Sequence, residues 1–131
     1  MPDFTVAKNL DDTRPVGFGI IGTGAIARHH ARSIQELPST FLVGVCSSSA
    51  ERAAAASQKF GVEGYSDLEQ FLNHPQLEVV CICTQSGNHL EASTAASSAG
   101  KHVLVEKPIE VTMERARKAI AVCKEEGVKL G

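Results

Sequence analysis

A short glycine-rich segment offers backbone N–H groups to an anion. It follows an apolar stretch, precedes a helix pattern, and reads Gly22-Thr23-Gly24-Ala25-Ile26-Ala27. The first glycine allows a tight turn, the second lets the backbone approach a phosphate, and the small third residue lets helix and strand pack closely. The free N–H groups at the helix start favour a diphosphate. The segment therefore predicts a site for NAD or NADP, with Gly22, Gly24, Ala25 and Ile26 as contacts.

The residues after the second predicted strand bear on the choice between the two dinucleotides. An acidic side chain there would accept a hydrogen bond from the adenosine ribose 2′-OH and repel a 2′-phosphate. This chain has Ser47 and Ser48 instead, and Arg52 one helical turn further on. We predict all three as cofactor contacts. Because hydroxyl groups can bind either a hydroxyl or a phosphate, the sequence leaves NAD and NADP both open.

Lys107, in the tripeptide Glu106-Lys107-Pro108, is the candidate catalytic residue. It follows the fifth predicted strand, and ligands of open α/β sheets bind beside the carboxyl ends of the strands. Its ammonium group can stabilise a developing alkoxide or transfer a proton. The alternative is a solvated surface lysine. Glu106 is expected to orient Lys107 or the chain, and Pro108 to fix the turn, for which a cis peptide bond is one route.

Strand and helix patterns alternate along the chain. Predicted strands cover residues 16–21, 41–46, 62–65, 77–84 and 102–106, and one more begins at 128–130. Predicted helices cover 24–37, 50–59, a short segment ending before Pro75, 88–99, and a segment from Thr112 to about 126. Ser49 and Thr112 are predicted N-caps, and Ser66 with Glu69 a capping box. The alternation predicts an α/β doubly wound parallel sheet (Rossmann fold) with strand order 3-2-1-4-5-6.

Composition sets the broad class. Apolar residues make up 43% of the 131 residues and charged residues 21%, which is typical of a soluble globular domain. The formal net charge is −2 and the chain has no basic block, so we do not expect it to bind nucleic acid. No stretch is apolar enough for a membrane span or a secretory signal, so we expect no membrane partner and a cytoplasmic location. The four cysteines lack C-x-x-C spacing, so buried thiols are expected rather than a metal site. We expect a flexible arm over residues 1–14 and one dinucleotide-binding domain over 15–131.

The chain resembles the family of glucose-fructose oxidoreductase, inositol dehydrogenase and rhizopine-catabolism (Gfo/Idh/MocA) proteins. Three stretches carry the resemblance: the glycine-rich segment, residues 83–89, and the Gly-Lys-His-Val strand that leads into Glu-Lys-Pro at 100–108. The resemblance implies a dehydrogenase that moves hydride between nicotinamide and a hydroxyl-bearing carbon of a sugar, cyclitol or nucleotide-sugar. In that family the lysine corresponding to Lys107 reaches the reacting oxygen and the nicotinamide ribose.

The resemblance also implies contacts on the nicotinamide side. The loop after the fourth strand would line the cofactor there, which adds Thr84, Gln85, Asn88 and His89 to the candidate contacts, with Glu106 and Lys107 beside them. Most members have proline in place of Gln85. His89 is expected either to face the ribose or to cap the following helix.

Members of the family continue into a second α/β domain that supplies most substrate contacts and often a homo-oligomer interface. We therefore expect this chain to bind dinucleotide with little or no turnover alone. The alternatives are a non-catalytic dinucleotide-sensing or regulatory module and an S-adenosylmethionine-dependent methyltransferase. The lysine of Glu-Lys-Pro favours the dehydrogenase over both.

Overall fold

A computed structural model describes residues 13–131. Residues 1–12 of the arm predicted over 1–14 therefore lie outside the described residues. Five strands form one parallel sheet: β1 (Val16–Ile21), β2 (Thr40–Cys46), β3 (Glu63–Tyr65), β4 (Val79–Ile82) and β5 (His102–Val105). Their order is β3-β2-β1-β4-β5, which confirms the predicted order for these strands. The predicted sixth strand is reduced to a single parallel bridge between Val103 and Leu130.

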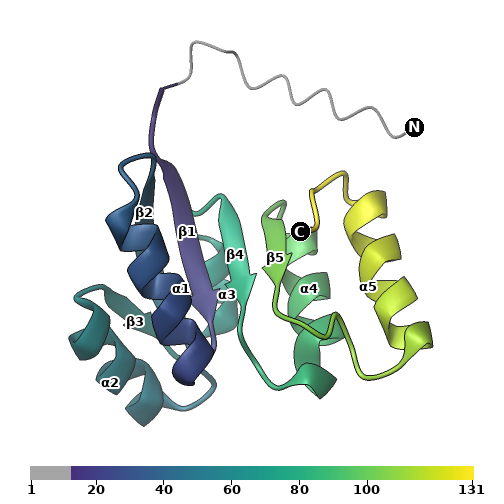
Figure 1. Cartoon of the computed structure of the whole chain (residues 1–131), viewed down its shortest axis with the longest axis horizontal. Helices are drawn as coiled ribbons and strands as arrows, with labels where there is room; N and C mark the ends of the chain where they lie inside the picture. The colour runs from purple at the N-terminus through teal and green to yellow at the C-terminus, as the bar shows by residue number, and fades with distance from the viewer. Residues whose placement is uncertain (1–12) are drawn as a thin grey trace.

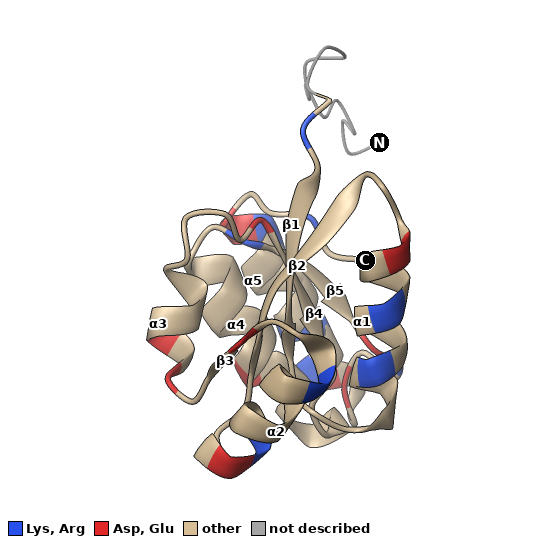
Figure 2. Ribbon diagram, turned by 90° about the vertical axis from the view of Figure 1, so that its left-hand side faces the viewer, with Lys and Arg blue, Asp and Glu red and all other residues tan. Residues whose placement is uncertain are grey.

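Helices cover both faces of the sheet. They are α1 (Ala25–Glu36), α2 (Ala50–Phe60), α3 (Leu68–Leu72), α4 (His89–Ser98) and α5 (Met113–Glu125), and a 3₁₀ turn η1 (Ser86–Asn88) precedes α4. Figure 2 shows α1 on one side of the strands and α3, α4 and α5 on the other. In Figure 1 the loops that follow the carboxyl ends of the strands lie at the lower edge of the sheet. The connections thus form the doubly wound arrangement that the alternation predicts.

Two apolar cores hold the layers together. One lies under α1 and α2, where Ala27 and Ala31 of α1 pack against Ile20 and Val45 of the central strands. The other lies under α3, α4 and α5 and includes the fully buried Phe71. Because the sheet is covered on both faces, its central strands are apolar throughout rather than alternating.

Most predicted helix ends are confirmed, and one is wrong. The Ser49 hydroxyl accepts from the Arg52 N–H and the Thr112 hydroxyl from the Arg115 N–H, so both are N-caps as predicted. The capping box on Ser66 is wrong: the N-cap is Asp67, whose carboxylate accepts from the backbone N–H of Gln70 at 3.1 Å. A carboxylate is also favoured by the positive end of the helix dipole, and this starts α3 one residue later than the serine would.

All four cysteines are buried and form no disulfide. Burial raises the pKa of Cys81 and Cys83 to about 12, so neither thiol is ionised at neutral pH. Residues 13–131 contain no group of three or more side chains that could hold a metal ion. None of the helices in this part of the chain is long and apolar enough to cross a membrane.

Candidate functional site

The turn from β1 to α1 requires glycine at position 22. Gly22 has φ +116°, and a Cβ added there would lie 2.5 Å from the carbonyl oxygen of Cys83. The Gly22 N–H donates to the carbonyl oxygen of Cys46 at 2.9 Å. The start of the glycine-rich segment is therefore pressed against the ends of β2 and β4, where any side chain would clash.

Gly24 has a different requirement. It is the N-cap of α1 with φ −76°, a conformation open to any residue, and no side chain caps the helix there. An added Cβ would meet no protein atom within 4 Å. The first turn of α1 therefore begins without a side-chain cap and beside open space at Gly24, an arrangement that suits a diphosphate.

A cavity of about 690 Å³ extends from this loop along the carboxyl edge of the sheet. It brings together most of the predicted cofactor contacts, namely Gly22, Gly24, Ser47, Ser48, Arg52, Thr84, Gln85 and Asn88. They come from the loops after β1, β2 and β4, which are neighbours in the sheet.

The cavity also has walls that the sequence analysis missed. Ser66 and Leu68, which follow β3, and Thr23 of the glycine-rich segment line it as well. Ser66 was assigned only to a helix cap. Its position at the carboxyl end of β3 was the signal that could have placed it here, because every parallel strand ends at the same edge.

Two predicted contacts, Ala25 and Ile26, do not line this cavity. Ala25 lines a smaller cavity between α1 and α2, which shares Thr23, Gly24 and Arg52 with the larger one. Ile26 is 40% exposed and lines neither of these two cavities.

The end of β5 is tied to α1. Nε2 of His30 lies 2.8 Å from Oε1 of Glu106, and Oε2 of Glu106 accepts from the backbone N–H of Lys107 at 3.2 Å. The hydrogen bond from His30 lowers the pKa of the Glu106 carboxyl, so it is ionised at neutral pH. Glu106 thus holds the backbone of Lys107 in place relative to α1, the helix that begins within the glycine-rich segment.

His89 joins two loops in the interior. Its ring is buried, with Nε2 at 3.0 Å from the carbonyl oxygen of Thr84 and Nδ1 at 2.8 Å from that of Pro108. The sequence analysis offered a ribose contact or a helix cap, and the structure shows neither. Both ring nitrogens contact backbone carbonyls, so His89 positions the loops after β4 and β5 and has no free nitrogen for a ligand.

Lys107 stands at the carboxyl end of β5, next to β4 in the sheet. Its side chain is exposed and lines neither the 690 Å³ cavity nor the smaller one between α1 and α2. The peptide bond between Lys107 and Pro108 is cis, as the sequence analysis anticipated.

A buried carboxylate anchors the turn that follows. Glu110 accepts from the backbone N–H groups of Leu90 at 2.8 Å and Val111 at 2.7 Å, and Arg115 lies 3.2 Å away. Burial by itself raises the pKa of Glu110, but the two backbone N–H groups and Arg115 outweigh it and lower the pKa to about 2. The start of α4 and the turn after Pro108 are therefore held to the same group.

Comparisons with known proteins agree with this geometry. Residues 16–131 match the family model described as "Oxidoreductase family, NAD-binding Rossmann fold". The 1,5-anhydro-D-fructose reductase of Ensifer adhaerens is 36% identical over 115 residues, which cover 87% of this chain and 34% of that protein. The chain thus spans about a third of the length of the curated relatives it matches.

Solved structures of dehydrogenases and reductases are similar to this chain in fold and sequence. The WlbA dehydrogenase from Bordetella pertussis, in complex with NADH and UDP-GlcNAcA, has a TM-score of 0.82 and 30% identity, covering 88% of this chain and 35% of that one. KijD10, a 3-ketoreductase from Actinomadura kijaniata in complex with TDP-benzene and NADP, also has a TM-score of 0.82 and 30% identity, covering 89% and 37%.

Proposed function

We propose that this chain, which belongs to the oxidoreductase family with an NAD-binding Rossmann fold, is the NAD- or NADP-binding part of a dehydrogenase that acts on a sugar, cyclitol or nucleotide-sugar. The observation that carries the proposal is the open space at Gly24, where uncapped N–H groups of α1 face the cavity along the carboxyl edge. A diphosphate fits this arrangement because it needs hydrogen-bond donors and no intervening side chain.

The two halves of the cofactor would bind at opposite ends of the cavity. We assign the adenosine end to Ser47, Ser48 and Arg52, which follow β2, and the nicotinamide end to Thr84 and the 3₁₀ turn after β4. This division follows the usual direction of a dinucleotide across the point where the strand order reverses, between β1 and β4. Gln85 and Asn88 then contact the nicotinamide half.

Lys107 is the residue that we propose for the chemistry. Bound nicotinamide would supply or accept the hydride. The Lys107 ammonium group would stabilise negative charge on the substrate oxygen and exchange a proton with it. Glu106 would act through the chain rather than on the substrate, since its carboxylate is already engaged by His30 and by the Lys107 N–H.

The names of the relatives support the class of substrate. They include an anhydrofructose reductase, an apiose dehydrogenase and an inositol dehydrogenase, all acting on polyhydroxylated compounds by name. A purely sensing module is not favoured, because sensing needs the phosphate loop but not the Glu-Lys-Pro lysine. The low turnover of the 131 residues alone, a homo-oligomer, the lack of nucleic-acid binding and the cytoplasmic location stay predictions.

Titration of the purified chain with NAD⁺, NADP⁺ and S-adenosylmethionine tests the proposal. Isothermal titration calorimetry at low salt should show binding of a nicotinamide dinucleotide, and the same ligand should raise the melting temperature, since it binds only the folded state. S-adenosylmethionine serves as the control that shares only the adenosine. Failure of both dinucleotides to bind, or tighter binding of S-adenosylmethionine, would refute the proposal.

A further inference from the structure

The loop assigned to the nicotinamide half leads into a helix that its own residues do not cap. Thr84, Gln85 and Asn88 line the cavity from this loop, which connects β4 to α4. Asn88 is the N-cap of α4, but its side chain makes no capping hydrogen bond. Because a helix start leaves backbone N–H groups without partners inside the helix, a partner for them has to come from another segment or from solvent.

Glu110 supplies that partner from the segment after β5. Its buried carboxylate accepts from the Leu90 N–H in the first turn of α4 through Oε2, at 2.8 Å, and from the Val111 N–H through Oε1, at 2.7 Å. In Figure 1 the segment between β5 and α5 passes beside the start of α4. A carboxylate 20 positions away therefore takes the role that a local N-cap usually has, and each of its oxygens holds a different segment.

Arg115 adds a second contact to the same loop. Its Nη2 donates to the carbonyl oxygen of Gly87 in η1 at 3.0 Å and lies 3.2 Å from Oε2 of Glu110. It also pairs with Glu91 of α4 at 2.7 Å. Because charge-assisted hydrogen bonds are stronger than neutral ones, the two acids fix the guanidinium group where it meets Gly87.

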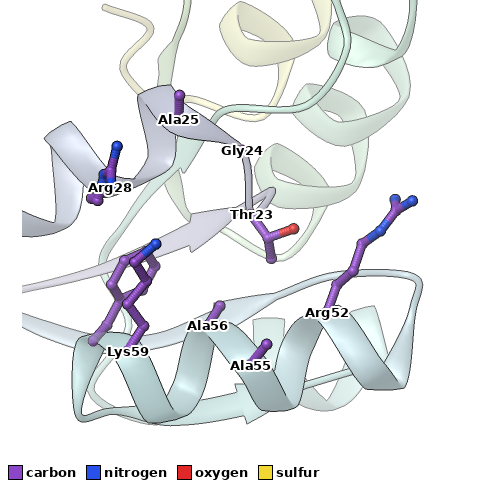
Figure 3. Close-up of a pocket in the computed structure, with 9 residues that line it drawn as sticks. Thr23, Gly24, Ala25, Arg28, Arg52, Ala55, Ala56 and Lys59 are labelled. Atoms are coloured by element: carbon purple, nitrogen blue, oxygen red, sulfur yellow. The ribbon is translucent and has the colours of Figure 1, made fainter.

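The adenosine end of the cavity is built by other elements. The loop after β2 and the start of α2 form it, and Figure 3 shows Arg52 extending from the first turn of α2 on the side of Thr23. Within residues 13–131, the hydrogen bonds of the Glu110 and Arg115 side chains go to α4, η1 and the turn before α5. A change at Glu110 should therefore reach only the nicotinamide end.

We infer that Glu110 and Arg115 are positioning residues for the nicotinamide half of the cofactor. They hold the loop of residues 84–88 in the shape that lines the cavity, and they tie it to the turn that follows Lys107. The inference rests on the proposed function and adds to it the residues that shape one end of the site. Neither side chain lines the cavity, so both act through the loop rather than on the cofactor.

Replacing Glu110 by glutamine tests the inference. The side chain keeps its size, but one of its two oxygens becomes an amide nitrogen, which cannot accept from an N–H group. Calorimetry at low salt, below the melting temperature of the variant, should show NAD⁺ and NADP⁺ bound about tenfold more weakly than by the unmodified chain, and ADP bound within about twofold. An equal loss of ADP binding, or an unchanged affinity for the dinucleotides, would overturn the inference.

ADP also separates this inference from the proposed function. If the unmodified chain binds neither dinucleotide, the proposed function fails and this inference with it. If the unmodified chain binds a dinucleotide no more tightly than ADP, the proposed function stands and the inference fails, because the nicotinamide half would then gain nothing from the loop.

Two further variants complete the test. Glu91→Gln is the matched control, since Glu91 also pairs with Arg115 but is exposed, and it should leave every affinity within about twofold. A loss as large as that of Glu110→Gln would contradict the role of the buried carboxylate.

Arg115→Gln removes the contact with Gly87 from a partly exposed position, so the variant should fold even if Glu110→Gln does not. It should weaken dinucleotide binding about threefold and leave ADP binding unchanged, the effect of one neutral hydrogen bond. An equal change for ADP, or an unchanged dinucleotide affinity, would overturn the inference on its own.

Discussion

Replacing Gly24 by alanine should separate cofactor binding from folding. The native φ of −76° suits alanine, and the added methyl group meets no protein atom within 4 Å. Alanine is a poorer N-cap than glycine by about 0.5–1 kcal/mol, but it lowers the entropy of the unfolded chain by a similar free energy. The two effects nearly cancel, so the melting temperature should change by less than about 5 °C.

The same methyl group should weaken the binding of the dinucleotide. It occupies the space through which a phosphate oxygen approaches the first N–H groups of α1. A hydrogen bond to a charged group is worth about 1.5–3 kcal/mol, so losing one should weaken binding roughly 10- to 150-fold.

Calorimetric titration with NAD⁺ and NADP⁺, paired with a thermal melt of each protein, measures both quantities. Arg117→Ala on α5 is the control, since Arg117 is exposed and lines neither cavity. If Gly24→Ala bound within twofold of the unmodified chain, the diphosphate would have to lie elsewhere. A large loss of stability would instead mean that the space at Gly24 is not open.

Three further changes test the frame around the site. Gly22→Ala should cost about 3 kcal/mol or more in urea denaturation, because of its positive φ and the clash with the Cys83 carbonyl, and a stable variant would contradict the turn geometry. The pKa of Glu110 is lowered to about 2, so ionised Glu110 stabilises the fold above its ordinary pKa, and this stabilisation is lost as the pH falls from about 4.5 toward 2. The melting temperature of Glu110→Gln should therefore depend less on pH in that range than that of the unmodified chain, and an equal dependence would refute this. His89→Ala should lower the free energy of unfolding by about 2–4 kcal/mol, since it leaves a cavity and unpaired carbonyls at Thr84 and Pro108, and a loss below 0.5 kcal/mol would contradict its role.

The geometry of the glycine-rich turn could be predicted because it is local in sequence. A strand, a glycine-rich turn and a helix within residues 16–36 define it, and the strand order that is usual for the dinucleotide-binding fold is the one observed for the first five strands. Ser47, Ser48 and Thr84 follow from that order, since each stands just after a strand that ends at the same edge. Short-range patterns and general topology were sufficient to place these residues at one edge of the sheet.

The remaining features depend on contacts between distant parts of the chain. Nothing near His30 indicates a partner 76 positions away in Glu106. His89 follows η1 and resembles a helix cap in sequence, yet its ring turns inward to carbonyls of two loops. Lys59 belongs to the last turn of α2 and reaches the smaller cavity only because α1 and α2 pack side by side. Spacing along the chain carries no information on such pairings.

These distant contacts form a connected set that positions the backbone of Lys107. Gly22 touches the end of β4, His89 joins the loop after β4 to the loop after β5, and Glu106 joins the end of β5 back to His30 on α1. These contacts connect α1 to Lys107 in two ways: through His30 and Glu106, and through Gly22, the end of β4 and His89. An exposed lysine needs such a frame if it is to meet a cofactor held by backbone amides at α1, because its own side chain makes no hydrogen bond or ion pair with residues 13–131 that would hold it there.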